Sequence, residues 1–149
     1  MKKLIILIIL FSTSFAFNLT FMKIFNDFSE GENLLKTNPS LANEKFQEAY
    51  KLIQKLKIKN YSSQINYMLG QMYFHGWGVT QNYNLAKKYL LKAIKLGNKR
   101  ANCSLAKLYL KLNKIDLAQK YLKIALSNKT IVNDCKNLII QLKNIKEQQ

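Results

Sequence analysis

A chain of 149 residues in which 48% of the side chains are hydrophobic can bury a core, and its length corresponds to one domain rather than an intrinsically disordered segment. The formal net charge is +16, and the stretch from Ala49 to Ile115 contains thirteen Lys or Arg residues and no acidic residue. This stretch predicts a cationic surface, although a drift of the whole composition towards Lys would give the same pattern.

The N-terminal residues have the layout of a secretory signal. Two lysines precede an apolar run over residues 4–11, and cleavage is expected after Ala16, so that residues 1–16 form a signal peptide. The run is shorter than the roughly 20 apolar residues of a membrane-spanning helix, but an uncleaved anchor stays as the alternative because no charge separates Lys3 from Lys23. Export predicts a periplasmic or secreted protein, with anionic envelope polymers as candidate partners and no nucleic acid.

Apolar side chains recur at helical spacing from residue 65 onward. No run alternates apolar and polar residues as a half-buried strand would, and five Gly with one Pro leave few turns. An all-α fold is therefore predicted. The apolar positions of the successive helices are Ile65, Met68, Leu69, Met72 and Tyr73; Ala86, Tyr89, Leu90, Ala93 and Ile94; Ala101, Leu105, Leu108, Tyr109 and Leu112; Ala118, Tyr121, Leu122, Ala125 and Leu126; and Ile131, Cys135, Leu138, Ile139, Leu142 and Ile145.

These helical segments are copies of each other. "LGQMY" (residues 69–73) matches "LAKLY" (residues 105–109), and "LAKKYLLKAI" (residues 85–94) matches "LAQKYLKIAL" (residues 117–126). The pattern predicts a solenoid of α/α-hairpin repeats, in which each hairpin buries its apolar stripe against the next. Gly70 in mid-helix costs about 1 kcal/mol relative to Ala, which a close helix crossing would offset.

The segment from Ile65 to Tyr109 resembles a Sel-1-like repeat, an α/α hairpin related to the tetratricopeptide repeat. The family's acidic residue after the turn is replaced here by Asn82 or Asn84, either of which can still cap the following helix. The positions that match the family pattern are Leu69, Gly70, Tyr73, Gly76, Gly78, Val79, Ala86, Tyr89, Ala93, Gly97 and Ala101. The implied organisation is a degenerate hairpin (17–60), a full repeat (61–97), a shorter repeat without the glycine turn (98–128) and a C-terminal capping helix (129–149).

The turn between the two helices of the full repeat contains the only His and the only Trp of the chain. Gly76 and Gly78 are expected to reverse the chain there, with Trp77 and Val79 covering the end of the hairpin core. No Cys, Asp or Glu lies near His75 in sequence to complete a metal site or a catalytic triad. No metal, cofactor or catalytic residue is predicted.

The resemblance implies that the first helix of each hairpin lines an inner wall that holds a protein or peptide partner, acidic or mixed in charge. The expected function is a non-enzymatic interaction module of the cell envelope. The residues expected to be exposed on this wall are Tyr67, Gln71, Phe74, Cys103 and Lys107. A separate cationic ridge, which could also serve only to solvate the outer face, is expected at Lys88, Lys92, Lys95 and Lys99.

Cysteine-rich exported members of the family imply an alternative function, binding or weak hydrolysis of β-lactams. "SLAK" (residues 104–107) matches the S-x-x-K motif of serine penicillin-recognising enzymes, and Lys129-Thr130 matches part of their K-T-G motif. Ile131 replaces the glycine of K-T-G, no S-D-N motif follows, and the predicted fold has no sheet. The interaction module is therefore preferred over the hydrolase.

Cys103 and Cys135 have neither a redox spacing nor enough companions for a zinc site. In the cysteine-rich relatives, cysteines seven residues apart pair, but the corresponding positions here are apolar. The repeat register places Cys103 and Cys135 at equivalent positions of successive hairpins, about 8–10 Å apart, whereas a disulfide needs Cα atoms within about 7 Å. Two free or half-buried thiols are therefore expected, and a disulfide would need a shift of the last helix.

Overall fold

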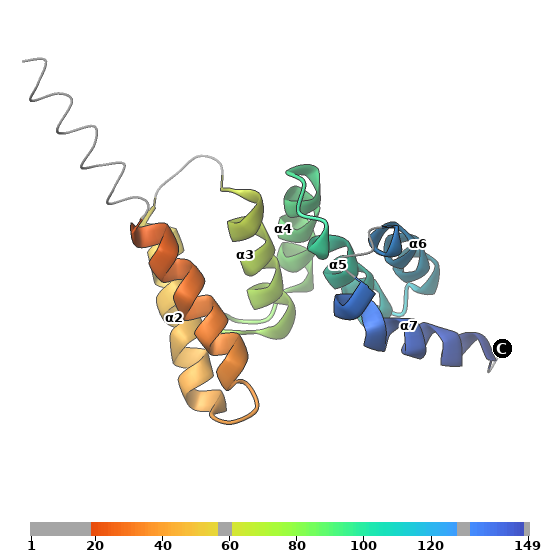
Figure 1. Ribbon diagram of the computed structural model, residues 1–149, viewed down its shortest axis with the longest axis horizontal. Helices are drawn as coiled ribbons and strands as arrows, with labels where there is room; N and C mark the ends of the chain where they lie inside the picture. Colours follow the sequence, from red (N-terminus) through yellow and green to blue (C-terminus); the bar gives the residue numbers. More distant parts are fainter. Residues whose placement is uncertain (1–18, 57–60, 128–131, 148–149) are drawn as a thin grey trace, which may run out of the picture. The chain divides into compact units, whose positions relative to one another are not determined.

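A computed structural model describes residues 19–56, 61–127 and 132–147 (Figure 1). The predicted signal segment and the Lys129-Thr130 pair lie outside these ranges. All regular secondary structure within them is α-helical, which confirms the all-α prediction. None of the described helices combines the length and the apolar character needed to cross a bilayer. The chain divides into two compact units, residues 1–57 and residues 58–149.

The first unit is a helical hairpin of residues 19–34 and α2 (Pro39–Lys55). Asn38 begins α2, because its side-chain oxygen accepts a hydrogen bond from the Leu41 N–H at 3.1 Å. In the core the Phe46 ring meets the Phe28 ring edge-on, with ring centroids 5.4 Å apart. A Cβ added to Gly31 would lie 2.8 Å from the Phe46 ring. The two helices therefore approach closely at this glycine.

Ion pairs in the first unit use some of the five acidic residues that lie between Asp27 and Glu48. Lys45 Nζ lies 3.3 Å from a carboxylate oxygen of Glu30 and so joins the two helices. Lys23 Nζ lies 3.1 Å from Asp27 one turn away on the same helix. Lys23 and Lys45 therefore have acidic partners nearby, whereas the stretch from Ala49 to Ile115 contains no acidic residue.

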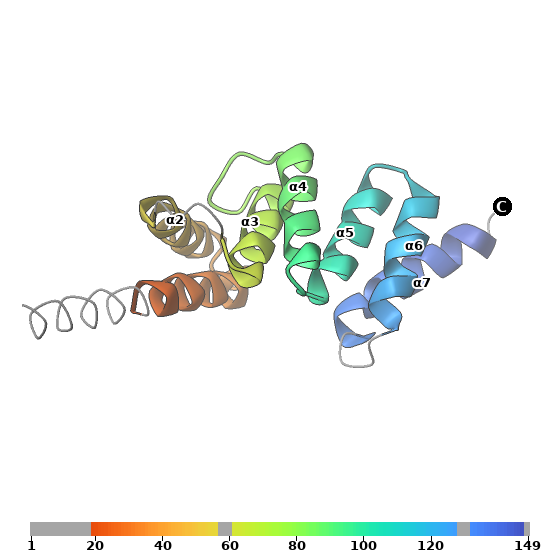
Figure 2. The same cartoon turned by 90° about the horizontal axis from the view of Figure 1, so that it is seen from above.

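The second unit contains two antiparallel helical hairpins and a further helix (Figure 2). The first hairpin pairs α3 with α4, the second pairs α5 with α6, and α4 contacts α5. The last helix, α7, contacts both α5 and α6. The bounds of these helices are α3 (Ser63–His75), α4 (Tyr83–Lys95), α5 (Arg100–Lys111), α6 (Ile115–Leu126) and α7 (Val132–Glu147).

Stacked tyrosine pairs show that the two hairpins are structural copies. Tyr73 of α3 stacks on Tyr89 of α4 with centroids 5.7 Å apart and ring planes 3° from parallel. At the equivalent positions Tyr109 of α5 stacks on Tyr121 of α6, at 5.5 Å and 22°. The duplication read from the sequence is thus present in the packing of the second unit.

The turns of the two hairpins both contain residues with positive φ, but the residue types differ. Gly76 ends α3 in the left-handed conformation with φ of 77°, and Gly78 follows with φ of 68°. In the shorter second turn Asn113 adopts φ of 56°, a conformation that Asn tolerates better than most residues. Asn82 caps α4 through its side-chain oxygen, which accepts from the Leu85 N–H at 3.0 Å. Asn82 rather than Asn84 therefore replaces the acidic cap.

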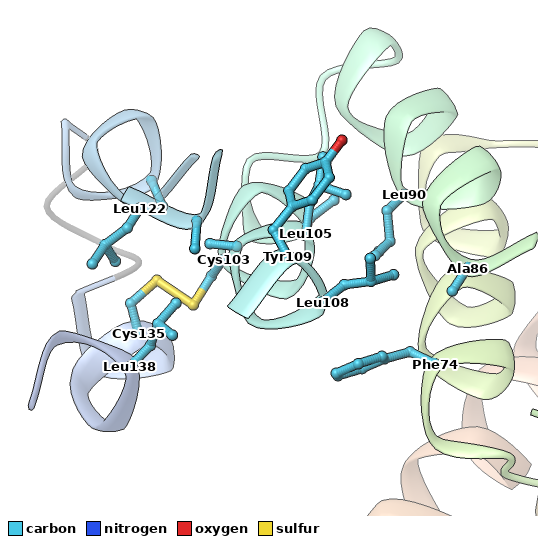
Figure 3. Close-up of a cluster of buried hydrophobic side chains, with 14 of the residues drawn as sticks. Phe74, Ala86, Leu90, Cys103, Leu105, Leu108, Tyr109, Leu122, Cys135 and Leu138 are labelled. Carbon is cyan, nitrogen blue, oxygen red and sulfur yellow. A yellow bond between two sulfur atoms is a disulfide. The ribbon is translucent and has the colours of Figure 1, made fainter. Parts of the chain in front are cut away.

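The core of the second unit is built from leucines and from small residues (Figure 3). Gly70 lies where α3 crosses α4: a Cβ added there would be 2.7 Å from Cγ and Cδ2 of Leu90 and 3.3 Å from the Leu90 backbone nitrogen. This confirms the close crossing expected at this glycine. The fully buried alanines and leucines of the cluster are Ala86, Leu90, Ala93, Ala101, Leu105, Ala106, Leu108 and Ala118.

Replacing Gly70 by Ala should lower the free energy of unfolding by about 1 kcal/mol, although Ala is the better helix former. The added methyl group overpacks the crossing at a cost of about 1–3 kcal/mol, and the gain in helix propensity offsets about 1 kcal/mol of it. Urea unfolding followed by circular dichroism measures the difference. In a Leu90→Ala background the same change should instead stabilise the fold, and stabilisation in the native background would contradict the close crossing.

Candidate partner-binding groove

A groove of about 690 Å³ lies along α5, between the C-terminal end of α3 and one side of α7. On α5 and α7 its residues recur every three or four positions, so each helix presents one edge to it. The lining residues are Phe74 of α3; Lys107, Leu110 and Lys111 of α5; and Asn137, Leu138, Gln141, Asn144 and Ile145 of α7.

The lining of this groove combines three kinds of side chain. Apolar groups come from all three helices, with Phe74 on α3 and Leu138 on α7 as examples. Lys107 and Lys111 place two positive charges on α5, and the amide side chains come from α7. No acidic residue is among the lining residues. Such a surface can bury apolar side chains while offering cations and amide hydrogen bonds at its rim.

Two of the four predicted partner-binding residues, Phe74 and Lys107, meet in this groove. The Phe74 ring extends from α3 toward α5 (Figure 3). The expectation that Tyr67, Phe74 and Cys103 are exposed was wrong, because their exposed fractions are 7%, 9% and 2%. All three belong to the hydrophobic cluster that α3 shares with the helices that follow. Packing between successive hairpins therefore buries residues that the repeat pattern had placed on an exposed inner wall.

Tyr67 and Gln71, the other two predicted binding residues, lie outside the groove. The Gln71 Nε2 group donates a hydrogen bond to the Tyr67 hydroxyl oxygen at 3.3 Å. The guanidinium carbon of Arg100 lies 5.9 Å from the centroid of the Tyr67 ring, within the range of a cation–π interaction. These side chains connect α3 to the start of α5. A role for them in binding stays a prediction.

His75 follows Phe74 at the end of α3 and lies outside the lining of the groove. Its imidazole stacks on the Trp77 ring, with centroids 4.3 Å apart and planes 14° from parallel, and lies 4.5 Å from the Phe74 ring. The neighbouring rings cover part of the imidazole, and this partial burial, followed by the positive charge of Lys107, lowers the pKa of His75 to about 4. His75 is therefore neutral at neutral pH and adds no charge to the two lysines.

A disulfide between Cys103 and Cys135 joins α5 to α7 (Figure 3). The expectation of two free thiols was wrong, since the two Cα atoms are 5.7 Å apart. That expectation assumed the ordinary spacing of stacked helices, whereas α7 comes nearer than that to α5 at Cys135. Leu138 follows Cys135 by one turn and lines the groove. The disulfide therefore fixes the position of the α7 wall.

Ser104, the nucleophile of the alternative β-lactam hypothesis, is buried in α5 with 4% of its surface exposed. It does not line the groove, whereas Lys107 of the same S-x-x-K motif does. A substrate would have to displace packed helices to reach the hydroxyl. Across residues 19–56, 61–127 and 132–147, no group of three His, Cys, Asp or Glu side chains could hold a metal ion.

The predicted cationic ridge is divided by the structure. Lys88, Lys92 and Lys95 line a second groove of about 480 Å³, which involves α3 and α4. Lys99 is not among its lining residues and precedes α5. The three lysines of α4 thus form a cluster of their own, separate from Lys107 and Lys111.

A comparison with protein families supports the assignment of α3 and α4 as a repeat hairpin. Residues 65–98 match the family model described as the Sel1 repeat. This segment is similar to a Sel1 repeat. It comprises nearly all of α3, the glycine turn and α4. No curated protein and no solved structure matches the chain.

Most of the groove lies beyond the Sel1 repeat and was missed by sequence reasoning. Leu110 and Lys111 follow Lys107 at helical spacing, a signal that could have extended the predicted wall along α5. In α7, Leu138 and Ile145 were already among the predicted apolar positions, but nothing in the sequence showed that this face of α7 meets α5 in a groove. The missed residues are Leu110, Lys111, Asn137, Leu138, Gln141, Asn144 and Ile145.

Removal of the disulfide by the double substitution Cys103→Ser and Cys135→Ser should lower the free energy of unfolding by about 2–4 kcal/mol, as expected for a closed loop of this size. The cysteines are 32 positions apart in the chain. Urea unfolding of the oxidised, reduced and double-Ser proteins measures the change. The reduced and double-Ser proteins should agree with each other. Two titratable thiols in protein purified without reductant would contradict the bond.

An NMR titration of the single histidine should give a midpoint well below the usual value of 6.5. Because the folded state binds the proton more weakly than the unfolded chain, His75 lowers stability as the pH falls from about 6.5 toward 4. Lys107→Gln removes the nearby positive charge and should raise the midpoint. A midpoint at or above 6.5 in the native protein would show that the imidazole is not buried by its neighbours.

Proposed function

We propose that this protein is an exported, non-enzymatic interaction module that holds an acidic segment of a partner protein in the groove of α3, α5 and α7. The Sel1 repeat supports this proposal, since helical scaffolds of this kind typically serve protein interactions. The observation that carries it is the meeting of Phe74 and Lys107, from successive hairpins, in one groove closed by α7.

The chemistry of the groove favours a peptide with both apolar and acidic side chains. An apolar residue of the partner would be buried against the half-buried Leu110 and Ile145 side chains, while a carboxylate would pair with Lys107 or Lys111. The amides of α7 are suited to the polar backbone of an extended chain. The lining of α7 from Asn137 to Ile145 spans about 12 Å, which is the length of roughly four residues of extended peptide.

The disulfide and the N-terminal sequence support an oxidising location for this binding. A disulfide between Cys103 and Cys135 would persist in the periplasm or outside the cell and would be reduced in a cytosol. The basic and apolar pattern of residues 1–16 is that of a secretory signal. Both observations agree with a partner in the cell envelope, where the groove would keep the shape that α7 gives it.

Selection from a displayed library of random peptides, with the oxidised protein as bait, should enrich peptides that alternate acidic and apolar residues. The affinity of a synthetic selected peptide is then compared among variants by fluorescence anisotropy. Lys107→Gln with Lys111→Gln should weaken binding about tenfold, since two rim ion pairs contribute about 1.4 kcal/mol together.

Lys114→Gln with Lys120→Gln is the matched control, because it removes the same charge from exposed positions outside the groove. This control should bind the peptide as the native protein does. Gln71→Ala tests whether Gln71, a predicted binding residue that lies outside the groove, contributes to the affinity for the peptide. Enrichment of neutral or basic peptides, or equal loss of binding in both double variants, would contradict the proposal.

A further inference from the structure

The second groove, of about 480 Å³, is separate from the proposed peptide site and shares no residue with it. One side comes from the start of α3 and the residue before its cap, and the other from the C-terminal half of α4. The lining residues are Tyr61, Asn66, Lys88, Tyr89, Lys92, Lys95 and Leu96. They combine three cations, two tyrosines and one amide.

The charge of this groove is arranged along a line. Lys88, Lys92 and Lys95 are spaced at i, i+4 and i+7, so they follow one edge of α4 over about 10 Å. No acidic residue lines the groove, and none occurs in the chain from Ala49 to Ile115. An elongated ligand with repeated negative charge matches this row, whereas a compact ion could meet only part of it.

Asn66 supplies a second, independent observation. Its Nδ2 group donates hydrogen bonds to the backbone oxygens of Tyr61 and Ser62, both at 2.9 Å, which fixes the orientation of the amide. Its Oδ1 atom is buried and has no hydrogen-bond partner among the described residues. A buried acceptor without a partner is costly, and a hydroxyl donor that reaches it would relieve that cost.

We propose that this groove binds a linear anionic polysaccharide. The repeated carboxylates of such a polymer would pair with the row of lysines, and a sugar hydroxyl would donate to Asn66 Oδ1. Tyr61 offers aromatic surface for the apolar face of a sugar ring, whereas one face of Tyr89 is already stacked on Tyr73. Polyphosphate and anionic phospholipid headgroups supply the charge but are poorer sources of the hydroxyl donor.

The test uses the full mature chain and a fluorescent oligomer of polygalacturonate as the probe, with fluorescence anisotropy as the readout. Neutral dextran, polyphosphate and vesicles of anionic phospholipid serve as competitors. The native protein should bind the probe, with an affinity that falls as salt is raised, and neither dextran nor the phosphate-bearing competitors should displace it efficiently.

Lys88→Gln, Lys92→Gln and Lys95→Gln together should weaken binding at least about tenfold, as three partly screened ion pairs predict. The matched control combines Lys114→Gln, Lys120→Gln and Lys136→Gln, which removes equal charge from exposed positions outside the groove. The control should change the affinity less than about threefold.

Equal weakening in the two triple variants would overturn the proposal, because binding would then follow net charge alone. Displacement of the probe by polyphosphate or vesicles at equal charge concentration would also overturn it, in favour of phosphate recognition. Peptide binding in the first groove should be unchanged by Lys88→Gln, Lys92→Gln and Lys95→Gln, so the two proposals succeed or fail separately.

Discussion

Close approach of neighbouring helices at small residues is the constraint on which the second unit depends. At Gly70 there is no room for even one methyl group beside Leu90, so α3 and α4 sit at the separation that the glycine sets. Fully buried alanines such as Ala86 and Ala118 occupy core positions of the two hairpins. Because packed interiors tolerate little change in volume, these positions fix where the edges of the helices lie, and hence where the grooves form.

The primary groove lies where the last helix packs against the second hairpin. In the two hairpins the stacked tyrosines and the turns place equivalent residues in equivalent surroundings. By contrast, α7 is joined to α5 through Cys103 and Cys135 and contributes a mixed row of amide and apolar side chains. The two hairpins supply stability and spacing, and α7 supplies most of the lining of the groove.

Periodicity predicted the helices and the duplicated hairpins, because these follow from local spacing. The family resemblance predicted the glycine turn, a cap at Asn82 or Asn84, and Phe74 and Lys107 as parts of one surface. The burial of Tyr67 and the bond of Cys103 depend on how near α5 and α7 come to their neighbours, which no local pattern encodes. The α7 lining of the groove could not be predicted because the sequence does not show how closely α7 approaches α5.

The covalent link also changes how the end of a linear array behaves. In a solenoid each element is held only by its neighbours, so a terminal helix is ordinarily the first to fray. Here α7 is tethered to α5, which precedes α6 in the chain. The α5 helix packs against α4 of the first hairpin and against α6 of its own hairpin. If α7 detached, the disulfide would therefore keep it close to the surface on which it packs. Its return would be an intramolecular step, favoured by a high effective concentration.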